Sequence, residues 1–149
     1  MNVTFDVLGI PAPQGSKTAI TRNGRAHVIE GGSTTGRAKH RSWRTAVAEI
    51  AHDIATGLDG PLDGPLELHI TFRLPMPASR PKRIQVAGVA WHSVKPDGSK
   101  LLRATEDALT DAGLIRDDAR IARFTVTKLE VVGWTGAQIR VGPIDEVAA

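Results

Sequence analysis

The chain has 149 residues, a formal net charge of +3 and no cysteine. A chain of this length is expected to form one compact domain, and we assign residues 1–149 to it. The lack of cysteine excludes a disulfide framework, a thiolate metal site and a cysteine nucleophile, and favours a reducing compartment. We expect no membrane span and no signal peptide, because no apolar run approaches roughly 18 residues and the first residues lack a cationic start.

The N-terminal segment has the pattern of strands. Residues 3–7 alternate apolar and polar side chains with the period of a half-buried strand. Two short runs, 18–22 and 25–29, flank Asn23-Gly24, a dipeptide favoured where both central residues of a hairpin turn need positive φ. These runs predict a basic β-hairpin.

A helix and a strand are predicted next. The glycine-, serine- and threonine-rich segment 31–36 predicts a loop, and apolar residues at helical spacing from Trp43 to Ile54 predict a helix ending near Gly57. Residues 66–74 then alternate strictly between apolar and polar side chains, which predicts a strand. We expect its polar face to point towards the functional site.

The C-terminal half contains a second helix and two further strands. Segment 75–94 is rich in proline and cations without a sustained period, which predicts a long surface loop. Residues 101–112 have an apolar helical stripe, with Gly113 in the position of a left-handed cap. Residues 124–131 and 137–141 are predicted strands joined by a bend. The element order is therefore strand, hairpin, helix, strand, helix, strand, strand.

Charge is distributed unevenly along the chain. Segments 14–44 and 73–103 each contain seven cations and a single acidic residue, whereas segment 104–120 has an excess of acidic residues. Such a contrast suits a polyanion held by cations beside an acidic pocket that holds a metal. Solvated faces and loops would give the same composition, so this feature leaves both interpretations open.

The second predicted helix has a polar face. Residues four apart stack on one side of a helix, and here they are Ser99, Arg103 and Asp107, followed by Thr110. Asp97 stands just before the first turn, where the helix dipole and free backbone amides keep a carboxylate ionised and oriented. A carboxylate in this place can cap the helix or ligate a metal.

Asp117 and Asp118 form an adjacent acidic pair on the way into a strand. Two carboxylates about 4 Å apart repel by roughly 4 kcal/mol at an effective dielectric near 20, so a chain that holds them close usually offers a cation. In an extended chain, neighbouring side chains point to opposite faces and the repulsion largely disappears. Only one of the two therefore needs to reach a metal.

Taken together, these motifs resemble the RusA family of Holliday junction resolvases, the phage-type crossover junction endodeoxyribonucleases. The resemblance rests on segments 95–110 and 117–121, on the strand that contains Lys128, on segment 11–17, and on Trp43-Arg44, where the first helix of the family begins. It implies an α+β fold, with a mixed sheet, a basic β-hairpin and two main helices packed on the sheet. It also implies a nuclease of DNA recombination and repair in the cytoplasm of a bacterial or phage-infected host cell.

The resemblance also assigns site residues. Asp97 corresponds to the first metal-binding aspartate, Arg103 takes the place of the catalytic lysine, and Asp118 is the later catalytic aspartate, with Asp117 beside it. The family's second metal-binding aspartate is Ser99 here, and a hydroxyl is a weaker ligand for a hard cation than a carboxylate. Mg²⁺ is the implied cofactor. The site could therefore be active, weakened or inactive.

The implied partners are a four-way DNA junction and a second copy of the chain. The cations expected to contact DNA phosphates are Lys17, Arg22, Arg25, Arg80, Lys82, Arg83, Lys95 and Lys100. No nucleotide cofactor is expected, because residues 15–18 lack the full spacing of a phosphate-binding loop. Two alternatives stay open, a DNA-binding protein without catalysis and a small protein that binds acidic partners.

Overall fold

The computed structural model describes the backbone of residues 1–13, 17–22, 25–30 and 34–145, and the side chains of residues 1–13 and 42–145. The elements are, in order, β1 (Val3–Leu8), β2 (Lys17–Arg22), β3 (Arg25–Glu30), α1 (Thr34–Thr56), β4 (Leu66–Pro75), α2 (Lys82–Ala87), β5 (Val89–Trp91), α3 (Gly98–Asp111), the 3₁₀ turn η1 (Asp118–Arg120), β6 (Ile121–Val131) and β7 (Gly136–Pro143). None of the described helices combines the length and apolar composition that a membrane crossing requires. The predicted α+β fold is confirmed.

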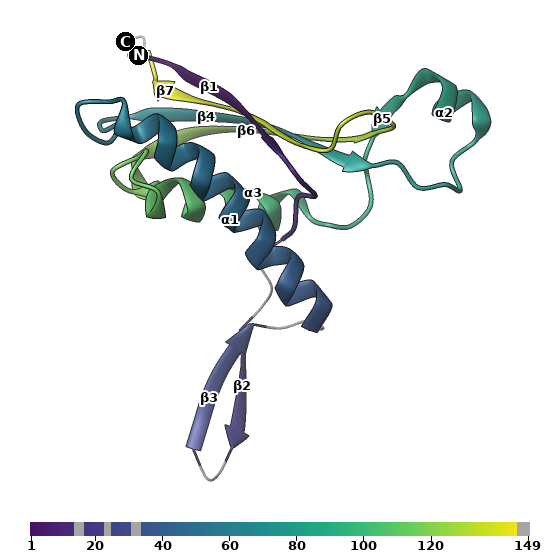
Figure 1. Ribbon diagram of the computed structural model, residues 1–149, viewed down its shortest axis with the longest axis horizontal. Coiled ribbons are helices and arrows are strands. Elements are labelled where there is room, and N and C mark those ends of the chain that lie inside the picture. The colour runs from purple at the N-terminus through teal and green to yellow at the C-terminus, as the bar shows by residue number, and fades with distance from the viewer. Residues whose placement is uncertain (14–16, 23–24, 31–33, 146–149) are drawn as a thin grey trace.

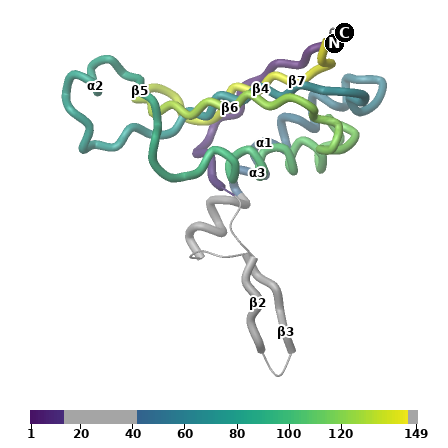
Figure 2. Tube along the Cα trace, turned by 180° about the vertical axis from the view of Figure 1, so that it is seen from behind, coloured from purple at the N-terminus to yellow at the C-terminus, as the bar shows by residue number. Residues whose placement is uncertain are grey.

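One mixed sheet organises the molecule, with strand order β1-β7-β4-β6-β5, and β2 pairs with β3 in a second sheet. β4 and β6 are parallel, while the other neighbours in the large sheet are antiparallel. The chain between the two parallel strands contains α3. Both α1 and α3 cover the same face of the sheet (Figures 1 and 2). The site on α3 is therefore built on a crossover helix.

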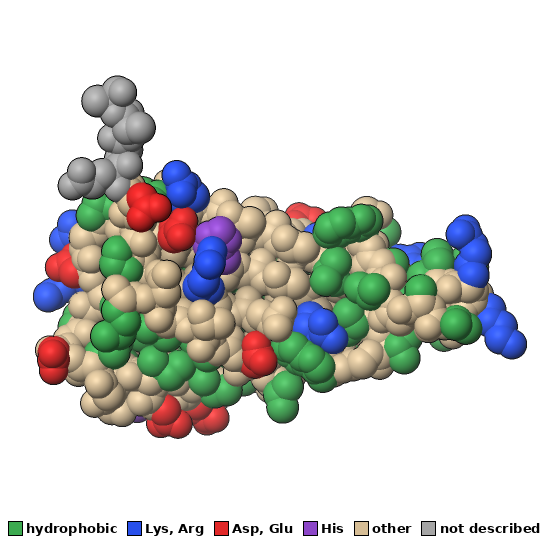
Figure 3. Space-filling view, turned by 90° about the horizontal axis from the view of Figure 1, so that it is seen from above, with side chains coloured by type: hydrophobic (Ala, Val, Ile, Leu, Met, Phe, Trp, Pro, Cys, Tyr) green, Lys and Arg blue, Asp and Glu red, His purple; other side chains and the backbone are tan. Residues whose placement is uncertain are grey.

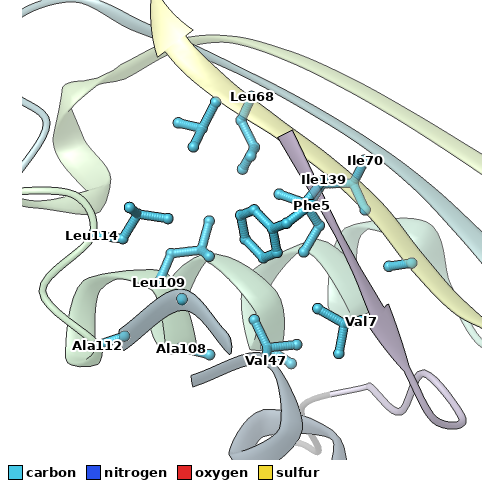
Figure 4. Packing of buried hydrophobic residues seen from close by; sticks show 14 of the residues in the cluster. Phe5, Val7, Val47, Leu68, Ile70, Ala108, Leu109, Ala112, Leu114 and Ile139 are labelled. Carbon is cyan, nitrogen blue, oxygen red and sulfur yellow. The ribbon is translucent and has the colours of Figure 1, made fainter. Parts of the chain in front are cut away.

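The hydrophobic core lies between the sheet and these two helices. Sheet residues such as Phe5 and Ile139 point towards Val47 of α1 and Leu109 of α3 (Figure 4). β4 alternates strictly, with its apolar side chains buried in this core. Its polar side chains consequently point to the opposite face of the sheet, away from α3. The expectation that the polar face of β4 points towards the functional site was wrong, because the helices cover its apolar face.

Specific contacts tie α3 to α1. The indole N–H of Trp43, which is buried, donates to Oγ1 of Thr105 at 3.3 Å, and that hydroxyl donates to the carbonyl of Leu101 at 2.9 Å. Nearer the end of α3, Arg44 forms an ion pair with Asp111. These contacts fix both the rotation and the position of α3, so the side of the helix that faces solvent is determined.

α1 begins earlier than the sequence predicts. Its first residue is Thr34, inside the expected loop and ahead of Trp43, where the family's first helix was placed. Gly36 within a helix costs about 1 kcal/mol relative to alanine, which the buried residues further along α1 can offset. The predicted hairpin is confirmed by the register of β2 and β3, which pairs Arg22 with Arg25; its turn lies outside the described residues.

Residues 76–94, called the arm below, were expected to be a loop and instead contain α2 and β5. β5 pairs with the end of β6, with Val89 opposite Val131 and Trp91 opposite Leu129. Figure 1 shows α2 at the far end of the arm, beyond the helices that cover the sheet. A helix of six residues and a strand of three are too short to leave a periodic pattern, which explains the incorrect prediction.

Two predicted turns are confirmed. Gly113 follows α3 with φ of 79°, and the amide of Leu114 donates to the carbonyl of Leu109 at 3.1 Å, as expected for a left-handed helix end. The bend between β6 and β7 is also present, although β4 lies between those two strands in the sheet. At this bend the guanidinium of Arg73 lies 4.2 Å from the centre of the Trp134 ring.

Candidate functional site

The candidate site lies along the solvent-facing side of α3. The opposite side of the helix is buried, and its buried residues are Leu101, Ala104, Thr105, Ala108 and Leu109. Ser99 and Arg103 are exposed, and Asp107 is partly exposed. Because residues four apart stack along a helix, these three side chains form one polar row. The sequence predicted this row correctly.

Asp97 is the residue that precedes α3, with extended backbone angles. Its carbonyl accepts from the amides of Lys100 and Leu101, at 3.2 and 3.1 Å, but its side chain makes no capping hydrogen bond. The carboxylate is 56% exposed, and Nζ of Lys100 lies 3.9 Å from it. The structure therefore excludes the capping alternative, and the Asp97 carboxylate is free to bind another group.

Asp117 and Asp118 differ in their surroundings. Oδ1 of Asp117 accepts from the amide of Ala119 at 2.9 Å, and this bond lowers the pKa of Asp117. The pKa of Asp118 is raised, first by the hydrogen bond it shares with Asp117, then by burial and by the negative charges of Asp117 and Asp107. Asp117 thus caps η1, which leaves Asp118 as the member of the pair that faces the acidic side of α3.

Glu106 is a site residue that the sequence analysis did not select. Burial raises its pKa to about 7, the charges of Asp118 and Asp107 act in the same direction, and Arg103 opposes them. Glu106 therefore belongs to an acidic group with Asp107, Asp117 and Asp118. The sequence feature that could have identified Glu106 is its position next to Asp107 in the acidic segment 104–120.

The site residues divide between the two ends of α3. Asp107 is ten residues beyond Asp97, which corresponds to about 15 Å along a helix axis. The interactions of Asp118 are with the residues around Asp107, and none joins it to Asp97 among the residues whose side chains are described. Arg103 lies between the two ends and interacts with Glu106.

The acidic group offers carboxylate oxygens to a divalent cation. In the described part of the chain, no three His, Asp or Glu side chains are arranged to hold a metal by themselves. Mg²⁺, however, is usually bound through one or two carboxylates together with waters and substrate phosphates. The negative charges that add to burial in raising the pKa of Glu106, and to the Asp117 hydrogen bond and burial in raising that of Asp118, repel one another, and a cation relieves this repulsion. The residues therefore fit a cation that substrate oxygens help to bind.

The expected DNA-binding cations have different environments. Lys82, Arg83 and Lys95 are exposed, and Lys and Arg side chains gather at the end of the molecule formed by the arm (Figure 3). Lys100 is exposed as well, beside Asp97. The side chains of Lys17, Arg22 and Arg25 lie outside the described residues.

Arg80, one of the cations expected to contact DNA, forms an ion pair inside the protein. Its guanidinium binds both carboxylate oxygens of Glu130, which is only 1% exposed, and Nη2 of Arg80 lies 3.0 Å from Oε2. Arg80 is thus paired with a buried carboxylate and holds the arm against β6, and its contact with phosphate stays a prediction. The local sequence gave no sign of this pair, because the two residues are fifty positions apart.

Comparison with known proteins agrees with this arrangement. The family model described as Endodeoxyribonuclease RusA matches residues 12–141, which is most of the chain. No curated protein matches the chain at a significant level. The matched range contains the polar row of α3, Asp97, and the pair Asp117-Asp118. The resemblance in the sequence is therefore confirmed: the chain belongs to the RusA family of endodeoxyribonucleases.

Proposed function

We propose that this protein is a Mg²⁺-dependent, structure-selective endonuclease that resolves four-way DNA junctions in recombination and repair. One observation carries the proposal: the free carboxylate of Asp97, the cation Arg103 and the acidic group around Asp118 share the exposed side of α3. This arrangement occurs in a chain that belongs to an endodeoxyribonuclease family.

The proposed reaction is hydrolysis of a phosphodiester by water, without a covalent intermediate. A bound Mg²⁺ supplies a Lewis acid for a phosphate oxygen and lowers the pKa of a coordinated water. Asp97 and Asp118 are the proposed ligands at the two ends of α3, and each would hold a cation at its own end, Asp97 with Ser99 beside it and Asp118 with Asp117 beside it. Arg103 is placed to bind the phosphate and stabilise the negative charge that develops on it. Asp107 and Glu106 make this region favourable for a cation.

Binding of the DNA is proposed to rest on phosphate contacts from exposed cations. The described members are Lys82, Arg83, Lys95 and Lys100; the hairpin residues Lys17, Arg22 and Arg25 complete the set. Binding of this kind weakens steeply as salt rises and carries little base specificity. A four-way junction requires paired incisions, so we propose that a homodimer presents two sites to it.

A cleavage assay tests the proposal. A synthetic four-way junction and a linear duplex of the same sequence are each incubated with the protein, with and without Mg²⁺. We expect paired nicks in the junction only when Mg²⁺ is present, and little cutting of the duplex. Equal cutting of both substrates would contradict the proposed selectivity for junctions, and cutting in EDTA would contradict the proposed requirement for a metal.

A second candidate function is supported by Ser99. Because this residue replaces an aspartate of the family pattern, the protein could bind junctions while cleaving them slowly or not at all. The same assay separates the two functions when it is combined with a gel shift. Retained junction binding with no Mg²⁺-dependent nicking, or with nicking only at stoichiometric enzyme, supports the binding protein, whereas Mg²⁺-dependent nicking with multiple turnovers supports the nuclease.

A further inference from the structure

The segment that leads into Asp97 is held by side chains at three consecutive carbonyls. Nζ of Lys128 donates to the carbonyl of Val94 at 2.8 Å and to that of Pro96 at 2.7 Å. Between them, Nε2 of His92 lies 2.8 Å from the carbonyl of Lys95. We call Lys128 and His92, with the residues that hold them, the carbonyl clamp.

The clamp is anchored in the sheet. Lys128 and Glu130 are two residues apart on β6, so their side chains lie on the same face of the sheet. Nδ1 of His92 lies 2.8 Å from Oε2 of Glu130, and Arg80 binds the same carboxylate. The two ring nitrogens of His92 thus lie against two different oxygens, that of Glu130 and that of the Lys95 carbonyl. Glu130 therefore holds two side chains of the arm, Arg80 and His92, against β6.

The carbonyl clamp holds the backbone immediately before Asp97. Its last bond is to the carbonyl of Pro96, whose carbon is bonded to the amide nitrogen of Asp97. The side chain of Asp97 makes no capping bond that would fix its own direction. Lys128 also packs beside the start of α3, since its Cδ would lie 3.8 Å from a Cβ built on Gly98. The orientation of the Asp97 carboxylate consequently depends on backbone that Lys128 and His92 hold.

We propose that Lys128 and His92 are positioning residues that fix the Asp97 carboxylate in the direction needed to bind the divalent cation. This inference rests on the proposed nuclease function, because it assigns Asp97 to the cation. Lys128 acts through the backbone and not by touching the substrate. It differs in this respect from the exposed cations of the arm, which are proposed to contact phosphates.

The test uses the full chain with the substitution Lys128→Met, which keeps the length of the side chain and removes its charge. Arg140→Met is the matched control, because Arg140 is an exposed cation of β7 that faces away from the helices. We expect Lys128→Met to raise the Mg²⁺ concentration for half-maximal junction cleavage by about tenfold, the scale seen when residues that orient metal ligands are removed. Lys128→Arg should restore most of the loss, since a guanidinium can also donate to two carbonyls.

A second readout does not require activity. Amide order parameters from NMR relaxation should be about 0.85 for Val94, Lys95 and Asp97 in the unaltered protein and fall below about 0.6 in Lys128→Met. Unchanged order parameters would overturn the clamp, whether or not the protein cleaves DNA. Absence of junction cleavage in the unaltered protein would instead overturn the proposed function, and the NMR result would still decide the clamp.

Two other outcomes would also overturn the proposal. Weaker junction binding in EDTA with an unchanged Mg²⁺ requirement would make Lys128 a phosphate contact. A lower Tm alone, with normal order parameters and Mg²⁺ dependence below that Tm, would make it only structural. If Lys128→Met does not fold, His92→Phe tests the same point: it removes the bond to Lys95, and Arg80 still neutralises Glu130.

Discussion

The two ends of α3 hold their carboxylates in opposite ways. At the start, Asp97 stands with Lys100 nearby, and its direction depends on the carbonyl clamp. At the other end, burial and neighbouring negative charges raise the pKa of Glu106, and the hydrogen bond with Asp117, burial and neighbouring negative charges raise the pKa of Asp118. In the proposed metal site, the carboxylate at one end is prepared by its orientation, and those at the other end by burial and by the repulsion of neighbouring charges.

The largest expected effect comes from removing one carboxylate at each end. Asp97→Asn and Asp118→Asn keep the shape of the side chain and remove the charge that is proposed to bind the cation. We expect each substitution to lower the rate of Mg²⁺-dependent junction nicking by about 10²- to 10³-fold, as for loss of other electrostatic groups in active sites. Single-turnover cleavage with a gel readout measures this.

Asp59→Asn is the control, because Asp59 is an exposed residue between α1 and β4. Junction binding in EDTA should be unchanged in both site variants. If only one variant loses activity, then one end of α3 is sufficient and the comparison fails. If either variant no longer folds, as judged by circular dichroism, that aspartate is structural.

The next effect concerns stability and the anchor of the clamp. Glu130→Gln leaves Arg80 and His92 without their buried negative partner, and we expect a loss of about 3 kcal/mol in the free energy of unfolding, measured with urea. Arg80 is the main reason that the pKa of Glu130 falls to about 2 despite its burial. Because this folded-state pKa is below the ordinary value, the stabilisation is present above about pH 4.5 and is lost as pH falls towards 2.

The Gln variant should therefore lose that acid dependence. Glu49→Gln, an exposed glutamate on α1, provides the comparison and should keep the acid limb of the unaltered protein. Equal stability of Glu130→Gln and the unaltered protein at pH 7 would mean that the arm is not anchored by this carboxylate.

A smaller effect is expected from restoring the family residue. Ser99→Asp places a carboxylate one turn before Arg103, on the same exposed row as Asp107. We expect the cleavage rate at limiting Mg²⁺ to rise by about tenfold, because a carboxylate is a stronger ligand for a hard cation than a hydroxyl. Measuring the rate across a Mg²⁺ titration tests this. An unchanged rate at every concentration would show that Ser99 does not limit the site.

The smallest effect concerns Glu106 and is measured without metal. Its folded-state pKa of about 7 lies above the ordinary 4.5, so the folded protein binds more protons between these values and stability falls as pH rises through that range. Glu106→Gln removes this decline, and we expect it to be more stable than the unaltered protein by about 1 kcal/mol at pH 8 in EDTA, after allowing for solvent screening. If the stability of Glu106→Gln and of the unaltered protein changed with pH in the same way, the raised pKa of Glu106, and with it the burial and neighbouring charge at this end of α3, would be contradicted.

Much of the fold follows from local patterns in the sequence. The strict alternation of residues 66–74 predicted β4, and the apolar stripe with Gly113 predicted α3 and its end. These patterns predict a helix or a strand because each element buries one face along its whole length, so its apolar residues recur with the period of that element. The arm was missed for the converse reason, since α2 and β5 are too short to show a period.

The sequence named candidate residues around α3, whereas most of the contacts of these residues came from the structure. The sequence by itself determined which face of α3 is polar, because helical spacing alone places Ser99, Arg103 and Asp107 together. Only the tertiary structure decided that the side chain of Asp117 caps η1, whereas that of Asp97 makes no capping bond. It also decided that Glu106 lies in the acidic group and that Arg80 forms an ion pair with Glu130. The physical reason is distance along the chain: spacing within a helix is fixed by its geometry, whereas partners from separate strands and turns meet only when the sheet register brings them together.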